Sequence, residues 1–234
     1  MCGLAGIYSH KPVATELYDS LIHLQHRGQD AAGITTYNKH MHKTKGLGLV
    51  RDIFTEKKIK RLKGNIGIAH TRYPTHGGFG HGEIQPFWTS VPYGIALAHN
   101  GNLTNYNELA KNITSNESRY LNTNSDTEVL LHLFAELLHD RNKHDNDKEF
   151  FDGLCSALEN IYEHVHGAYS VVALVIGKGL VAFRDPHGIR PLVKGIRSNS
   201  NGEHDYIIAS ENTMFYPLGF KPDGNVLPGE LIYI

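Results

Sequence analysis

Cys2 stands out first for its chemistry, because it directly follows Met1. A small second residue permits removal of the initiator methionine, which would leave one residue with both a thiol and a free α-amine. Such an amine titrates at about pH 7.7–8.0 and can accept a thiol proton near neutral pH. The alternative is an ordinary residue at a loose chain end. Because residues 4–8 read as a strand, we expect Cys2 to be anchored where that strand begins.

Two further motifs lie at the ends of predicted strands. Residues 70–77 read HTRYPTHG, and an arginine before a proline turn, here Arg72, is well placed to hold a carboxylate with two hydrogen bonds. Residues 99–103 read HNGNL, in which the Asn100 amide and the Gly101 N–H could form an oxyanion hole. Taken singly, the two motifs also fit a surface arginine and an Asn-Gly turn.

Asp126 lies in the motif NSDTE, at the start of a predicted helix over residues 126–139. A carboxylate there can bind a substrate ammonium group, although acidic residues also favour this end of a helix because of its dipole. The helix opens with Ser125 three residues before Glu128, which predicts a capping box. Residues 25–33 read QHRGQDAAG and follow another helix, for which Gly28 is a plausible terminating glycine.

The predicted elements fall into two groups of helices with strands between them. The run Val171 to Ile176 is apolar at every position, which is typical of a strand buried on both faces. Two face-to-face sheets with helices on their outer faces would bury all of these elements, so we expect an α+β, four-layer αββα sandwich. The polar stretch 140–149 is predicted to be an exposed loop. We predict strands at 4–8, 33–37, 66–73, 93–99, 168–176, 180–184, 206–210 and 231–234, and helices at 16–26, 105–112, 126–139 and 152–164.

Composition excludes several classes of function. The 234 residues suit one domain, and a formal net charge of -1 argues against a nucleic-acid binder. Two cysteines form no disulfide framework, which favours a reducing, cytoplasmic compartment. No apolar run reaches the roughly 18 residues of a membrane span, and we expect no membrane association. The 16 histidines include no HExxH motif and no Cys-x-x-Cys pair accompanies them, so we expect no metal site.

Six ordered motifs resemble the glutaminase half of the amidophosphoribosyltransferase family. They are CGLAGIY, QHRGQDAAG, HTRYPT, LAHNGNLTN, NSDTE and FRDPHGIRPL, and the resemblance runs from Cys2 to the closing PGELIYI. It implies a class II glutamine amidotransferase domain over residues 2–234 with the N-terminal-nucleophile hydrolase fold. The phosphoribosyltransferase domain of that family is expected to be absent from this chain.

The resemblance also implies roles for individual residues. Cys2 would be the nucleophile, with its α-amine as base, and Asn100 and Gly101 the oxyanion hole. Arg72 would hold the α-carboxylate of glutamine and Asp126 its α-ammonium. The segment 185–192 would frame the face toward the partner domain. Residues in matching motifs near the same pocket are Arg27, Gly28, Thr75 and His76.

The implied reaction hydrolyses glutamine through a γ-glutamyl thioester, with ammonia destined for phosphoribosyl pyrophosphate in purine biosynthesis. We expect glutaminase activity only, no cofactor and no iron–sulfur cluster in this chain, and Mg²⁺ only in the absent domain. A homo-oligomer is expected for the full-length protein. Two alternatives remain, since Thr75-His76 resembles the sugar-transaminase amidotransferases, and retention of Met1 would favour a non-catalytic glutamine-binding domain.

Overall fold

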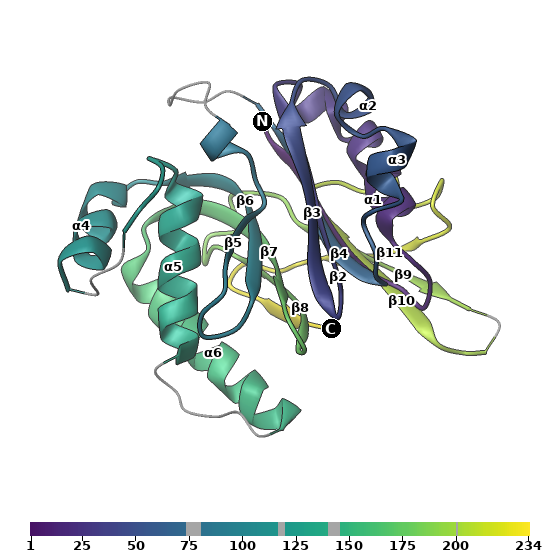
Figure 1. The fold of residues 1–234 in the computed structure, drawn as a ribbon. Coiled ribbons are helices and arrows are strands. Elements are labelled where there is room, and N and C mark those ends of the chain that lie inside the picture. Colours follow the sequence, from purple (N-terminus) through teal and green to yellow (C-terminus); the bar gives the residue numbers. More distant parts are fainter. Residues whose placement is uncertain (74–80, 117–119, 140–145, 200) are drawn as a thin grey trace.

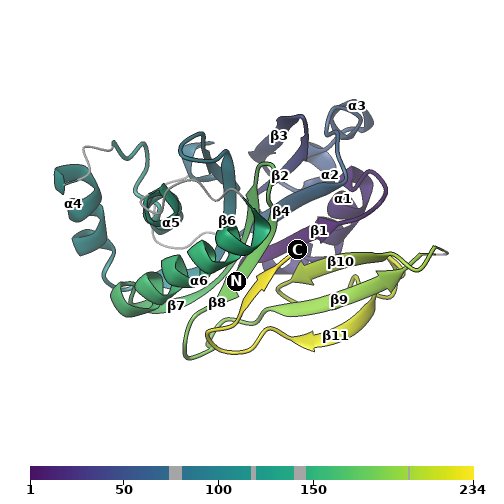
Figure 2. The same ribbon diagram turned by 90° about the horizontal axis from the view of Figure 1, so that it is seen from below.

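The structure, a computed structural model, describes residues 1–73, 81–116, 120–139, 146–199 and 201–234. Two antiparallel sheets form its centre (Figures 1 and 2). The larger has the strand order β11-β9-β10-β1-β4-β2-β3, and the smaller has the order β12-β8-β7-β6-β5. The strands are β1 (Gly3–Tyr8), β2 (Ala31–Asn38), β3 (His40–Leu47), β4 (Ile66–Arg72), β5 (Phe87–Thr89), β6 (Ile95–Leu103), β7 (Gly167–Val175), β8 (Gly179–Arg184), β9 (Val193–Ser198), β10 (His204–Ala209), β11 (Lys221–Asn225) and β12 (Leu231–Tyr233).

Helices cover the outer face of each sheet (Figure 1). The larger sheet carries α1 (Ala14–His23), α2 (Val50–Ile53) and α3 (Glu56–Ile59), and the smaller carries α4 (Tyr106–Asn116), α5 (Asp126–His139) and α6 (Asp147–His164). Short 3₁₀ turns span Gln25–Arg27 and His81–Glu83. None of the described helices has the length and apolar character to cross a membrane.

Three layers of apolar side chains hold the sandwich together, one between the sheets, one under α5 and α6, and one under α1. Between the sheets, Leu4 and Ile68 of the larger sheet belong to the same buried cluster as Val172 and Leu174 of β7. On its other face, β7 buries Val171 and the next alternate residues against α5 and α6. Successive side chains of β7 therefore pack into two different apolar cores, one on each face of the sheet. This confirms the expectation of a strand buried on both faces and of four layers.

The predictions were wrong at several boundaries. Polar strands were missed, because β3 is an edge strand without a buried residue and β11 is exposed at every position. Strand β6 continues through Leu103, so Asn100 and Gly101 lie inside a strand and not at a strand end or turn. The first helix ends at His23, before a 3₁₀ turn. Also missed were β5, β9, α2 and α3.

One helix start and one helix cap differ from expectation, whereas α5 has the predicted bounds. Helix α6 begins at Asp147, inside the predicted loop, and the Asn146 side chain caps it by accepting the Glu149 N–H at 3.0 Å; residues 140–145 lie outside the described part of the chain. The capping box of α5 does not form. Instead, the Glu128 carboxylate reaches past Ser125 and accepts hydrogen bonds from the backbone and side chains of Asn122 and Thr123.

Arg197 on β9 ties the larger sheet to α1. Its guanidinium donates to Glu16 at 2.9 Å, to Asp205 at 2.8 Å and to the Leu218 carbonyl at 2.6 Å. Burial alone would raise the pKa of Asp205, but hydrogen bonds from the His10 N–H, Arg197, the His10 ring and Ser9 lower it to about 2. This network therefore stabilises the fold in a pH-dependent way.

We expect Arg197→Met to lower the free energy of unfolding by about 2–3 kcal/mol at pH 7, because two carboxylates lose their cation. The effect is below that of a fully buried pair, since Arg197 is 21% exposed. The folded pKa of Asp205 lies below the unfolded value of about 3.9, so its contribution to stability is complete above about pH 4 and is lost as the pH falls toward 2.

Urea denaturation at pH 7 and pH 3 measures this prediction. The free energy of unfolding should fall less between the two pH values in the variant than in the wild type. Lys60→Met, which breaks the exposed pair with Glu56, is the control and should change stability by less than about 0.5 kcal/mol. Equal stability of Arg197→Met and the wild type at pH 7 would contradict this account.

Candidate active site

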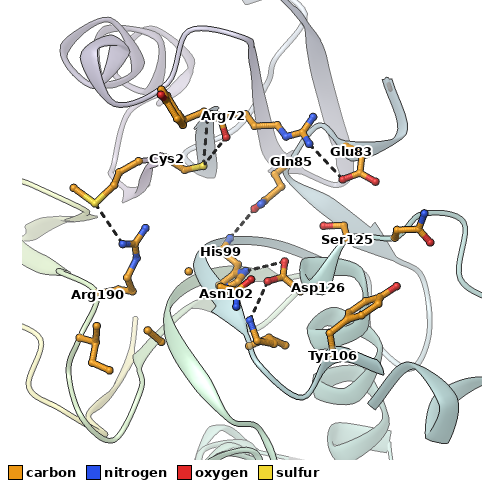
Figure 3. A pocket seen from close by; sticks show the side chains of 17 residues that line it. Cys2, Arg72, Glu83, Gln85, His99, Asn102, Tyr106, Ser125, Asp126 and Arg190 are labelled. Atoms are coloured by element: carbon orange, nitrogen blue, oxygen red, sulfur yellow. Dashed lines mark hydrogen bonds and ion pairs between the residues drawn. The ribbon is translucent and has the colours of Figure 1, made fainter. Parts of the chain in front are cut away.

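A hollow of about 620 Å³ opens where the two sheets meet beside α5. Four of the predicted site residues line it together: Cys2, Arg72, Gly101 and Asp126. Figure 3 labels Cys2, Arg72 and Asp126 around this hollow. Cys2 precedes β1, Arg72 ends β4, Gly101 lies in β6 and Asp126 begins α5. Residues far apart in the sequence thus present a thiol, a guanidinium and a carboxylate to one cavity.

The position of Cys2 is determined by its own backbone. The antiparallel register pairs Gly3 with Thr71, which places Cys2 beside the end of β4, and the Tyr73 N–H points at the Cys2 sulfur at 3.4 Å. The Cys2 carbonyl oxygen accepts two hydrogen bonds, from Asn100 Nδ2 at 2.9 Å and from Arg27 Nε at 3.0 Å. Cys2 is therefore anchored at a strand start, as predicted.

Arg27 and Gly28 support the site from behind and are absent from the lining of the hollow. The Arg27 guanidinium, with 9% of its side chain exposed, pairs with Glu211 at 2.9 Å while it holds the Cys2 carbonyl. Gly28 is extended, with φ at -162°, so it is not a left-handed helix terminator. A Cβ there would lie 2.5 Å from the carbonyl carbon of Arg72, which explains the glycine by close approach to β4.

Gly101 lines the hollow, whereas its neighbour Asn100 is buried and is not among the lining residues. Asn100 is 1% exposed, and its Oδ1 lies 3.2 Å from His70 Nε2. At Gly101, a Cβ would meet the Ala168 carbonyl oxygen at 1.9 Å, so only glycine fits against β7. The two residues occupy neighbouring positions of one buried strand, which keeps their separation fixed.

Asp126 is held ionised by its surroundings. Its Oδ2 accepts the Leu103 N–H at 3.1 Å, and its Oδ1 lies 3.7 Å from His99 Nδ1. Burial alone would raise the pKa of Asp126, but His99 and the N–H groups of Leu103 and Thr127 together lower it below the ordinary value. The site thus keeps a negative charge on Asp126, across the hollow from Arg72 (Figure 3).

Several groups that complete the hollow were not predicted from the sequence. Glu83 lies 3.5 Å from the Arg72 guanidinium, and both side chains are mostly buried. Gln85 accepts the His99 N–H at 2.7 Å and donates to Thr127 at 3.0 Å, which ties the segment before β5 to β6 and α5. Glu83 ends a short 3₁₀ turn and Gln85 lies in irregular chain, and in neither place does a periodic pattern point to the residue.

Other predicted residues have different places. Thr75 and His76 lie outside the described residues. The segment 185–192 does border the hollow, since Ile189 and Arg190 line it, and the Asp185 carboxylate accepts N–H bonds from His187 and Ile189 that shape the turn. Among the residues that the structure describes, no cluster of three or more His, Cys, Asp or Glu side chains could hold a metal ion.

A family model described as "Glutamine amidotransferase domain" matches residues 78–217. The chain belongs to this family. Among curated relatives, the amidophosphoribosyltransferases of Pseudomonas aeruginosa and Escherichia coli are 48% and 47% identical to it, over 100% of this chain and 46% of each relative. The chain therefore spans about half the length of the curated relatives it matches.

A solved structure agrees with this glutamine amidotransferase assignment. The glutamine phosphoribosylpyrophosphate amidotransferase of B. subtilis, complexed with ADP and GMP, superposes with a TM-score of 0.80 at 32% identity, over 98% of this chain and 46% of that one. The resemblance and the N-terminal-nucleophile hydrolase fold are thereby confirmed. The names of these relatives do not favour the sugar-transaminase alternative.

Proposed function

We propose that this chain is the glutaminase half of an amidophosphoribosyltransferase. One observation carries the proposal: a single hollow presents a thiol, a guanidinium and a carboxylate, the groups that complement the amide, carboxylate and ammonium of glutamine. Arg72 holds the α-carboxylate with paired hydrogen bonds, and Asp126 holds the α-ammonium. Glutamine bound between them extends its side-chain amide toward Cys2. Thr75 and His76 are proposed to contribute from the same motif as Arg72.

The chemistry proceeds in two halves. The Cys2 thiol passes its proton to the free α-amine, and the sulfur attacks the side-chain carbonyl carbon of glutamine. The Asn100 amide and the Gly101 N–H stabilise the oxyanion. The C–N bond breaks, ammonia leaves with the proton from the α-ammonium, and a γ-glutamyl thioester remains. Water then adds to the thioester and releases glutamate, which restores the thiol.

Removal of Met1 is a requirement of this mechanism, because the nitrogen of Cys2 is otherwise an amide and not a base. Met1 is 61% exposed and contacts Arg190 through its sulfur at 3.3 Å, so its excision disturbs no buried side chain. A chain that retains Met1 would be a glutamine-binding domain without turnover, which is the second candidate function.

The whole protein extends the reaction to a second site. We propose that ammonia passes to a phosphoribosyltransferase domain, where it displaces pyrophosphate from phosphoribosyl pyrophosphate to give phosphoribosylamine, and that any Mg²⁺ belongs to that domain. A cytoplasmic location, a homo-oligomeric full-length protein and the absence of a cofactor in this half are part of the same proposal.

The proposal is tested by the intact mass of the purified chain before and after treatment with 6-diazo-5-oxo-norleucine, with the adduct mapped by peptide mass. We expect loss of Met1 and one adduct on Cys2, because only an activated nucleophile in a glutamine-shaped pocket attacks this analogue. The control is Cys155→Ser, which removes the other free thiol, on α6, and should leave the labelling unchanged. Retained Met1 without an adduct, or an adduct only on Cys155, would contradict the glutaminase proposal and favour a non-catalytic glutamine-binding domain.

A further inference from the structure

His70 is a buried titratable residue that the proposed mechanism leaves unused. It lies on β4 of the larger sheet with no exposed surface, and its Nε2 is 3.2 Å from Asn100 Oδ1 on β6 of the smaller sheet. The contact therefore crosses the interface between the two sheets, which face each other in Figure 1. His70 Nδ1 has no hydrogen-bond partner among the described residues.

The direction of this hydrogen bond follows from the groups around Asn100. The Cys2 carbonyl oxygen is only an acceptor, so the group 2.9 Å from it must be the Asn100 NH₂. The amide oxygen of Asn100 then faces His70, and an oxygen can only accept there. His70 must therefore carry a proton on Nε2 and donate it to Asn100.

His70 carries only that one proton near neutral pH. Burial, together with the neighbouring His99, lowers the pKa of His70 to about 3, so the ring is neutral. A neutral ring with its proton on Nε2 leaves Nδ1 as a bare acceptor, which agrees with the missing partner at that atom. The geometry and the protonation state thus require the same tautomer.

The side-chain amide of Asn100 has three hydrogen-bonding groups, one oxygen and two N–H groups, and two of the three are engaged. Its oxygen accepts from His70, and one of its two N–H groups donates to the Cys2 carbonyl. The second N–H is the group that the proposed mechanism assigns to the oxyanion. If the amide rotated by half a turn, its oxygen would face the Cys2 carbonyl oxygen, and this free N–H would be lost from its position.

We propose that His70 is a positioning residue that, as a neutral Nε2–H donor, fixes the amide orientation of Asn100 and thereby assembles the oxyanion hole. This inference rests on the proposed function, since it assigns His70 a part in the same reaction. His70 touches neither substrate nor sulfur in this role, and its effect passes through Asn100.

Two variants of His70 separate positioning from packing. His70→Phe keeps the ring volume but removes the donor, and we expect kcat to fall about 10–100-fold with KM for glutamine nearly unchanged, less than the roughly 10²–10³-fold loss on deleting an oxyanion donor. His70→Gln supplies an amide N–H near the position of Nε2 and should recover much of kcat. Ile68→Val, a core truncation on the same strand, controls for lost stability and should keep wild-type kcat. Thermal melting and circular dichroism establish that each variant folds.

A double mutant and a spectrum complete the test. In an Asn100→Ala background, His70→Phe should lower kcat little further, because its effect on catalysis requires the Asn100 amide. A ¹H–¹⁵N spectrum of the His70 imidazole should show the Nε2–H tautomer at every pH from 5 to 8. In Asn100→Ala, the ¹⁵N resonances of the ring should shift, because the hydrogen bond to the amide oxygen is lost. An Nδ1–H or doubly protonated ring in that range, full additivity with Asn100→Ala, or wild-type kcat in folded His70→Phe would overturn the inference. An inactive wild-type chain would instead count against the proposed function.

Discussion

Cys2→Ser is expected to abolish glutamine hydrolysis, with a fall in kcat on the order of 10⁴-fold or more. A serine hydroxyl gives up its proton far less readily than a thiol, and the α-amine is too weak a base to ionise it. The substitution changes one atom, so the two hydrogen bonds to the carbonyl of residue 2 should persist. Glutamate release measured against time gives kcat, and calorimetry with glutamine gives the dissociation constant, which we expect to change little.

The control for this prediction is Cys155→Ser, which should retain wild-type turnover because Cys155 lies on α6 and does not line the hollow. A Cys2→Ser chain with substantial glutaminase activity would show that another group attacks the amide. A chain with lost affinity as well as lost turnover would show that the substitution disturbs the pocket and not only the nucleophile.

Asp126→Asn should produce the second largest effect, a rise in KM for glutamine of about 30–5000-fold. The basis is the loss of about 2–5 kcal/mol when one partner of a buried charge pair is removed. Asparagine keeps the shape and can still accept the Leu103 N–H, so the start of α5 should remain intact. Initial rates over a range of glutamine concentrations give KM, and Glu108→Gln, an equal charge change on the exposed face of α4, should leave it unchanged.

The pH dependence of binding provides a separate check on Asp126. Because its pKa is held below the ordinary value of about 3.9, the carboxylate stays ionised as the pH falls toward 4. Glutamine affinity should therefore be flat from neutral pH down to about pH 4 and weaken only below it. Weakening that begins near pH 5 would mean that the carboxylate holding the ammonium has a raised and not a lowered pKa.

Local pattern was sufficient to predict the parts of this protein that repeat with a regular period. The stripe of α5 and the apolar run of β7 both indicated burial, and the four-layer arrangement followed from the need to cover strands on both faces. Polar edge strands such as β3 escaped prediction because solvent accepts their side chains and no alternation is required.

Residue types and motif order also identified Cys2, Arg72, Gly101 and Asp126, which the fold brings to one hollow. Only the tertiary structure showed that Glu83 faces Arg72. It also showed that Arg27 donates a hydrogen bond to the Cys2 carbonyl and does not line the hollow. The contact of His70 with Asn100 between the two sheets was likewise visible only there. Each of these contacts joins separate elements, and its length and direction depend on how the elements pack. The spacing of residues along the chain reveals the periodicity of a single helix or strand. It does not show which side chains come into contact between two sheets.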